Sequence, residues 1–189
     1  MIRAVVKPRK NSPFRKSLPP ELRAEWDEMQ RTRVSTQRWS DGIVHFISLG
    51  DKEIKCPMNG VFTILDTAGG LCLMGLALHR PLRGSIDIAW GVELHKRELY
   101  GAAVARAYEL ESEFAQYPRI AVSPRVVNFL QAHLADTGED RYSQFNRSLA
   151  GVCLGLLASD ADGRPAHQAG FTLFDRVGPE CDNNLRYAS

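Results

Sequence analysis

The stretch VSTQRWSDGIVHFISL, residues 34–49, decides how the fold is interpreted. Two runs rich in β-branched and aromatic residues flank Ser-Asp-Gly, residues that tight turns favour. This arrangement predicts a β-hairpin with Asp41 at its tip. The second run is apolar at most of its positions, which predicts a central strand covered on both faces.

Helices and strands alternate along the rest of the chain. From Met58 to His79 the apolar residues recur at spacings of three and four, which predicts a helix packed on a sheet, with Gly69-Gly70 as the place for a break or bend. The other expected elements are a helix from Pro20 to Met29, a strand over 85–90, a short strand after Gly91, a helix over 100–116, a short strand before Ser123, a helix from Pro124 and strands over 151–158 and 169–174.

Some of these elements also carry a predicted face. For the helix over 100–116 we expect an inward face of Val104, Ala107, Tyr108, Glu111, Phe114 and Ala115. Ser123 is expected to cap the next helix, whose inward residues would be Val126, Val127, Leu130 and Leu134. The order of elements predicts an α+β fold, with helices on one face of a mainly antiparallel sheet.

Length and composition fit one domain with a core, because the chain has 189 residues of which 44% are hydrophobic. We expect residues 1–33 to form a basic, partly irregular flank with a short helix. Residues 34–178 would form the domain, and residues 179–189 a C-terminal tail. The longest apolar stretch, Val61 to Leu78, contains Asp66 and three glycines, so a membrane span is not expected.

The N-terminus is basic but carries no secretory signal, because no apolar stretch of suitable length follows its charges. We therefore expect a cytoplasmic protein. Residues 1–16 lack the aromatic interleaving of single-strand binders, so nucleic acid is not an expected partner. The four cysteines, Cys56, Cys72, Cys153 and Cys181, are widely scattered, and neither a zinc site nor a disulfide framework is expected.

Common catalytic motifs are missing from the sequence. It has no Gly-Lys-Ser/Thr phosphate loop, no HExxH, no CxxC pair and no GxSxG. What remains is a carboxylate at a hairpin tip, Asp41, and two cations at the edges of later strands, Arg83 and Arg119. A carboxylate on a hairpin can bind Mg²⁺, and an arginine at the start of a strand can bind a phosphate.

Three separated segments carry a resemblance to a known family: RWSDGIVHFIS, LRGSIDIAWGVEL and YGAAVARAYELESEFAQYPRIAVSP. In this order they resemble the class III nucleotide cyclases, and more narrowly the bacterial pyrimidine cyclases of Pycsar antiphage defence. The resemblance covers about residues 34–130. It implies a ferredoxin-like α+β fold, a homodimer, and a lyase that converts UTP or CTP to a 3′,5′-cyclic nucleotide and pyrophosphate as a signal in antiphage defence.

The resemblance also implies roles for single residues. Asp41 matches the second of the family's two metal-binding aspartates, so Mg²⁺ or Mn²⁺ is the implied cofactor. Arg119 falls where the wider family places a basic residue that contacts the triphosphate. Gln37 and Trp39 lie on the strand that would line the base pocket, and Tyr108 and Glu111 would belong to the helix that borders the cleft.

The sequence also departs from the family pattern. The family begins with a strand whose aspartate is the first metal ligand, and residues 1–33 contain nothing like it. Ala105 and Glu109 occupy the positions of the Asn and Arg that steady the transition state in the wider class. The alternative is therefore a degenerate or N-terminally truncated cyclase-fold module that binds a nucleotide or a partner protein, and Met1 would then be an internal start of a longer protein.

Structural interpretations compete with these roles. Asp41 is also a residue that turns prefer, and Arg83 could pair with a carboxylate at a strand edge. Asp87 is expected on the solvent side of a half-exposed strand. The five histidines show no ligand spacing, and His45 alternates with apolar neighbours as a core or edge residue would.

Overall fold

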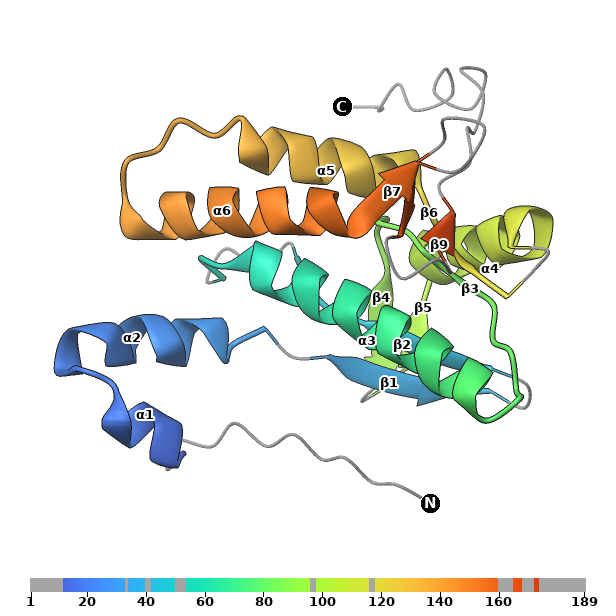
Figure 1. Cartoon of the computed structure of the whole chain (residues 1–189), viewed down its shortest axis with the longest axis horizontal. Coiled ribbons are helices and arrows are strands. Elements are labelled where there is room, and N and C mark those ends of the chain that lie inside the picture. The colour runs from blue at the N-terminus through green and yellow to red at the C-terminus, as the bar shows by residue number, and fades with distance from the viewer. Residues whose placement is uncertain are drawn as a thin grey trace.

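The computed structural model describes residues 12–32, 34–39, 42–49, 54–95, 98–115, 118–159, 165–167 and 172–173. Its helices are α1 (Pro13–Ser17), α2 (Pro20–Met29), α3 (Pro57–Ala77), α4 (Ala102–Phe114), α5 (Pro124–Leu134) and α6 (Arg141–Leu156). Its strands are β1 (Ser35–Arg38), β2 (Ile43–Phe46), β3 (Gly84–Ile86), β4 (Val92–His95), β5 (Glu98–Tyr100), β6 (Ile120–Val122), β7 (Leu157–Ser159), β8 (Pro165–His167) and β9 (Thr172–Leu173). Figure 1 shows their arrangement.

The described strands form four small sheets. β1 pairs with β2, β4 with β5, and β7, β8 and β9 with one another, all antiparallel. β3 and β6 pair in parallel, with Gly84 opposite Ile120. The chain is thus a mixed structure compatible with the α+β class. The described strands do not form the single, mainly antiparallel sheet that the sequence predicted.

The core lies around β6, whose three residues are all buried. On one side of this strand are side chains of α3, α5 and α6, which form the main apolar cluster: Met58, Val61, Leu65, Val122, Val126, Leu130, Ala150 and Cys153. On the other side α4 contributes a smaller cluster with Leu110 and Ala115. The pattern of three buried residues in a row is what a strand covered on both faces shows.

Several predicted elements are confirmed. α2 begins at Pro20 and ends at Met29, as the Pro-Pro start indicated. The helix predicted over Met58 to His79 forms as α3, but it runs unbroken through Gly69 and Gly70, where a break or bend was expected. At the start of α5 the Ser123 side chain accepts a hydrogen bond from the backbone N–H of Val126, and Pro124 occupies the first turn. The β1–β2 hairpin forms with Arg38 opposite Ile43.

The segment over 151–158 was predicted wrongly as a strand. Residues 141–156 form the helix α6, capped by the Asp140 side chain, which accepts from the backbone N–H groups of Tyr142 and Ser143. The run GVCLGLLA is apolar but contains only one β-branched residue. The buried residues of α6, Asn146, Ala150 and Cys153, are spaced by four and three, so they lie on one face of a helix that continues into this run. A short apolar run does not distinguish a buried strand from a buried helix by itself.

Two predicted faces are also wrong. β2 was expected to be central, but among the described strands it pairs only with β1, and Ile43 is 57% exposed. On α4, Tyr108 was placed inward and is 71% exposed, whereas the buried residue is Leu110. The predicted inward positions of Phe114 and Ala115 are confirmed, because both pack with Leu110 against Ala121 of β6.

α2, α3 and α6 meet where α3 begins. The residue before α3, Cys56, provides no side-chain cap. Instead Asn146 of α6 accepts from the backbone N–H of Met58 (3.4 Å) and donates to the carbonyl oxygen of Lys55 (2.8 Å). Glu28 of α2, which is buried, accepts from the backbone N–H of Lys55 at 2.8 Å. The first turn of α3 is thus capped by residues that are distant in the sequence.

By length and composition α3 is the one helix in the described residues that could cross a membrane, and 33% of its apolar window is buried in the fold. Its buried face carries Val61, Leu65 and Cys72.

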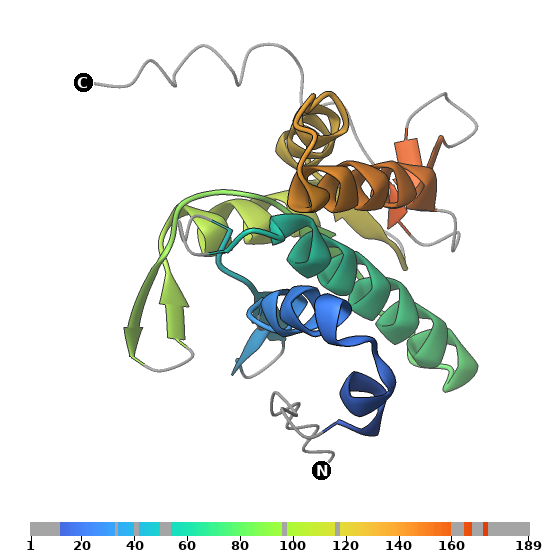
Figure 2. The ribbon, with the colours of Figure 1, turned by 90° about the vertical axis from the view of Figure 1, so that its left-hand side faces the viewer.

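The β4–β5 hairpin extends away from the helices, as Figure 2 shows.

Candidate functional site

The β1–β2 hairpin is closed by a hydrogen bond from the backbone N–H of Trp39 to the carbonyl oxygen of Gly42, at 2.9 Å. Residues 40 and 41 lie between these two, so the hairpin that the sequence predicted does bracket Asp41. Asp41 itself lies outside the described residues, and its predicted metal-binding role stays a prediction. Across the two strands, Thr36 Oγ1 and His45 Nδ1 are 3.0 Å apart, and burial lowers the pKa of His45.

Gln37 and Trp39, the two residues predicted for a base pocket, have different surroundings. The Gln37 side chain is half-buried, and its Oε1 accepts from the backbone N–H of Leu99 in β5 at 3.0 Å. This bond connects the first hairpin to the second. Trp39 is 53% exposed and is available for stacking. Gln37 therefore acts as a connector, while Trp39 retains an open aromatic surface.

Arg119 and Arg83 lie at the same end of the parallel pair β3–β6, because the backbone N–H of Gly84 donates to the carbonyl oxygen of Arg119 at 3.0 Å. Both side chains contact α4. Arg83 Nε is 2.5 Å from Glu111 Oε1, which confirms the carboxylate pairing considered for Arg83. The half-buried Arg119 donates from Nη2 to the carbonyl oxygen of Phe114.

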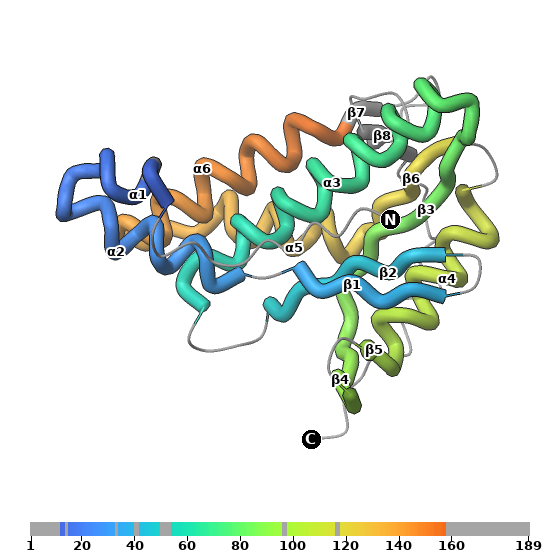
Figure 3. The backbone as a smooth tube through the Cα atoms, turned by 90° about the horizontal axis from the view of Figure 1, so that it is seen from below, coloured from blue at the N-terminus to red at the C-terminus, as the bar shows by residue number. Residues whose placement is uncertain are grey.

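Arg119 and Arg83 thus neutralise the C-terminal end of α4, where the helix dipole is negative. The end of β1 and the start of β2 lie on the same side of the molecule as α4, at the right of both Figure 1 and Figure 3. Of the predicted site residues, the structure brings Arg83 and Arg119 together, at one end of the β3–β6 pair and against α4.

The sequence did not predict the buried carboxylate of Asp87. Its side chain is only 2% exposed. Oδ1 accepts from the hydroxyl of Ser123 and from the backbone N–H of Ile88 (2.8 Å), and Oδ2 accepts from Arg125 Nη1 at 3.0 Å. The expectation of a solvent-side residue is wrong, because the start of α5 covers the end of β3. The motif Ser-Pro-Arg at 123–125, which supplies a hydroxyl and a guanidinium, is the signal that could have indicated a buried acceptor.

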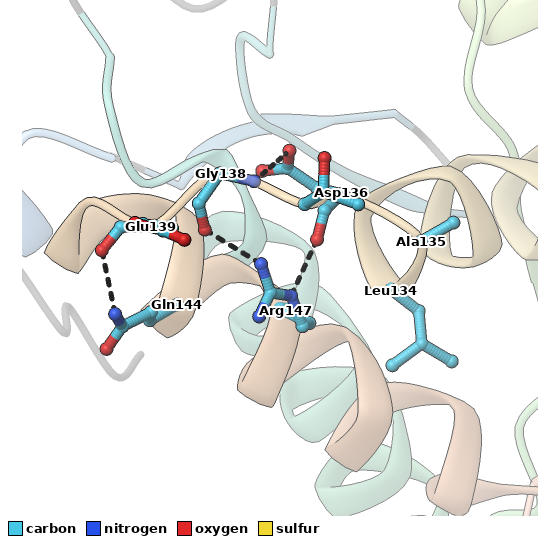
Figure 4. A pocket seen from close by; sticks show the side chains of 8 residues that line it. Leu134, Ala135, Asp136, Gly138, Glu139, Gln144 and Arg147 are labelled. Carbon is cyan, nitrogen blue, oxygen red and sulfur yellow. Dashed lines mark hydrogen bonds between the residues drawn. The ribbon is translucent and has the colours of Figure 1, made fainter.

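A hollow of about 490 Å³ lies in the loop between α5 and α6 (Figure 4). Arg147 crosses it and donates to the carbonyl oxygens of Asp136 (2.7 Å) and Gly138 (2.8 Å). The backbone N–H of Gly138 donates in turn to the Asp136 carboxylate, which lowers the pKa of Asp136. These polar groups bond to one another and fix the loop. The hollow contains none of the residues that the sequence marked for function.

No three His, Cys, Asp or Glu side chains lie together as metal ligands anywhere in the described ranges. Asp41, the residue that the resemblance implies as a metal ligand, lies outside these ranges. Cys56, Cys72 and Cys153 are buried and unbridged. Burial raises the pKa of Cys56 to about 11 and that of Cys153 to about 12, so these thiols behave as small hydrophobic groups.

No protein-family model, no curated protein and no solved structure matches the chain.

Proposed function

We propose that this chain is a nucleotide cyclase homologue that binds a pyrimidine nucleoside triphosphate, UTP or CTP, and forms the 3′,5′-cyclic nucleotide and pyrophosphate. The observation that carries the proposal is that Arg83 and Arg119 lie together at one end of the β3–β6 pair, while Trp39, close in sequence to the predicted metal-binding Asp41, is 53% exposed. A triphosphate needs placed positive charge, and a base needs an apolar or aromatic surface. The two arginines offer the positive charge, and the exposed Trp39 offers the aromatic surface.

Each residue would have a limited task in that reaction. Arg119, and Arg83 beside it, would hold the phosphate oxygens, because a guanidinium binds a phosphate through charge-assisted hydrogen bonds. Trp39 would stack on the base. Cyclisation forms a bond between the ribose 3′ oxygen and the α-phosphorus and releases pyrophosphate, so placing the triphosphate is most of what these side chains contribute.

A second function is favoured by a specific observation in the sequence, namely that residues 1–33 contain no counterpart of the family's first metal-binding aspartate. The chain would then be a cyclase-fold module that binds a triphosphate, or a partner protein, without turnover. Phosphate capture by Arg119 survives in this case, because it does not need two carboxylates. Turnover separates the two functions, and binding alone does not.

The experiment measures binding and turnover on the same protein. Purified chain is titrated with each of ATP, GTP, CTP and UTP in the presence of Mn²⁺, and the products are resolved by mass spectrometry. We expect UTP or CTP to bind most tightly. A cyclic pyrimidine nucleotide supports the cyclase, binding without product supports the silent module, and the absence of binding by any triphosphate refutes both nucleotide functions.

Variants localise the site. Arg119→Ala should weaken triphosphate binding by about 1.5–3 kcal/mol, the range of a hydrogen bond to a charged group. Arg141→Ala is the matched control: Arg141 is an exposed arginine that pairs with Glu25 at 2.6 Å, in α6 at the opposite end of the molecule. Equal loss in both variants would mean nonspecific electrostatic binding.

Asp41 is tested with two substitutions. Asp41→Asn keeps a residue that turns favour but removes the charge, and Asp41→Ala removes both. If Asp41 binds metal, both variants should abolish any Mn²⁺-dependent activity with little change in melting temperature. Full activity in Asp41→Asn would instead assign Asp41 to the turn alone.

A further inference from the structure

The helices α1 and α2 are joined to each other by an ion pair of their own. Arg15 of α1 donates from Nε and Nη2 to the two carboxylate oxygens of Asp27 in α2, at 2.7 and 2.6 Å. Arg23 of α2 donates to the carbonyl oxygen of Leu18, between the two helices, at 3.1 Å. We call this segment, residues 12–32, the arm. It lies at the edge of the fold where α6 begins, as Figure 3 shows.

Apolar packing contributes little to the attachment of the arm. Neither apolar cluster of the described residues includes a residue of the arm. Glu28 is the one buried residue of α2, and it carries a carboxylate, whereas the apolar Leu22 is 37% exposed. Segments with few buried apolar contacts open at a lower free energy than the core does. The arm is therefore held to the rest of the fold mainly by polar contacts.

Three of these polar contacts are made with the start of α3. The backbone N–H of Lys55 donates to Oε1 of Glu28 at 2.8 Å. Asn59 Nδ2 donates to the last carbonyl oxygen of α2 at 2.9 Å, and Thr32 Oγ1 donates to the carbonyl oxygen of Cys56 at 3.4 Å. Cys56 itself is 2% exposed, and its pKa is raised to about 11, first by burial and then by the negative charge of Glu28. The closed arm thus contributes to the protection of this thiol.

The remaining contact joins opposite charges of α2 and α6. Glu25 Oε1 is 2.6 Å from Arg141 Nη1, and the pKa of Arg141 is raised, first by this bond and further by the charge of Glu21. Glu21, Glu25 and Glu28 are spaced by four and three, so they lie on one face of α2. The side chains of Glu25 and Arg141 are 28% and 67% exposed, so water screens their pairing. A contact of this kind breaks more easily than an apolar core.

We propose that the arm is a detachable element, held by the acidic face of α2, that opens as a unit while the rest of the fold stays intact. In the open state the Glu28 carboxylate leaves the backbone N–H of Lys55, and Cys56 becomes accessible to reagents. α2 has 10 residues, too few for a stable helix in water by itself, so its backbone amides exchange once the arm is released. The opening does not involve the arginines proposed to bind a triphosphate and goes beyond the proposed function.

Thiol labelling at low salt and pH 8, resolved for each cysteine by mass spectrometry, tests the opening. Arg141→Glu places a like charge beside Glu25 and should raise the labelling rate of Cys56 about tenfold, because a buried group reacts from its open state. The labelling rate of Cys153, in the core, should not change. Glutamate in the first turn of α6 suits the helix dipole, so the variant should not weaken α6 itself. Arg80→Glu is the matched control, since Arg80 is exposed and lies after the far end of α3.

A charge exchange and amide hydrogen exchange complete the test. Combining Glu25→Arg with Arg141→Glu should restore the protection of Cys56. In the wild-type protein the amides of α2 should share one protection factor, at least about tenfold lower than that of the central amides of α6. Equal protection of α2 and α6 overturns the proposal, as does equal labelling of Cys56 in Arg141→Glu and Arg80→Glu. Joint acceleration of Cys56 and Cys153 in Arg141→Glu would indicate global unfolding and would also overturn it, and so would a double variant that stays unprotected.

Discussion

Removing the Asp87 carboxylate should destabilise the protein strongly. The Asp87 side chain is 2% exposed and accepts hydrogen bonds from the Ser123 hydroxyl and the backbone N–H of Ile88. In the Asp87→Ala variant both donors lose this acceptor. Leaving buried donors without a partner costs about 1–3 kcal/mol each. The ion pair with Arg125 adds little, at most about 1 kcal/mol, because that side chain is 35% exposed and screened by water.

The Ser123 hydroxyl can turn toward another acceptor, so the two buried losses do not add fully. We therefore expect a decrease of about 2–4 kcal/mol in the free energy of unfolding. For a chain of this length that corresponds to about 4–16 °C in melting temperature. Asp87→Asn keeps an acceptor oxygen but loses the charge, and should cost about half as much.

Urea unfolding followed by circular dichroism measures these differences. Arg125→Ala and the double variant Asp87→Ala/Arg125→Ala complete a cycle that isolates the ion pair from the other bonds. If Asp87 were a surface carboxylate, Asp87→Ala would lower the free energy of unfolding by no more than about 0.5 kcal/mol. That result would refute the buried network and restore the solvent-side position that the sequence indicated.

Three further predictions concern other parts of the fold. Cys56 and Cys153 should resist a maleimide at pH 8 in the native protein and react in urea, because burial raises their pKa values to about 11 and about 12. Mass spectrometry of the labelled peptides measures the reaction at each cysteine. Rapid labelling of the native protein would contradict this prediction. Burial lowers the pKa of His45, so the folded state binds fewer protons than the unfolded state. The free energy of unfolding should therefore be highest above about pH 6.5, the ordinary pKa of histidine, and should decrease as the pH falls below it. This decrease should be smaller in His45→Gln. Gly75→Ala should destabilise α3, because a Cβ would lie 2.6 Å from a backbone oxygen, whereas Gly155→Ala, with open space around it, should be neutral or stabilising by up to about 1 kcal/mol; equal melting temperatures for the two variants would contradict the packing.

Local signals in the sequence predicted the elements whose ends are fixed by their own residues. The Pro-Pro start of α2 and the Ser123-Pro124 start of α5 act within one turn of the helix, so the sequence contains the whole explanation. The β1–β2 hairpin is similar, because Trp39 and Gly42 close it locally.

Elements whose environment depends on distant segments were predicted less well. The sequence cannot show that α5 covers Asp87, or that Leu110 rather than Tyr108 contacts β6, because these contacts join separate elements. The second half of α6 has an apolar composition that suits a strand or a helix, and tertiary packing decides between them. At the candidate site, the sequence identified Arg119 and Arg83 as cations at strand starts, but not that α4 contacts both.

The cap that Asn146 provides to α3 has a consequence for synthesis of the chain. The backbone N–H of Met58 donates to Oδ1 of Asn146, a residue 88 positions later in the chain. At about 5–20 residues per second, the ribosome needs roughly 4–18 seconds to make that intervening stretch. During this interval the first turn of α3 lacks its cap while its apolar side chains are already made, so nascent chains that end before α6 should be the ones that need a chaperone.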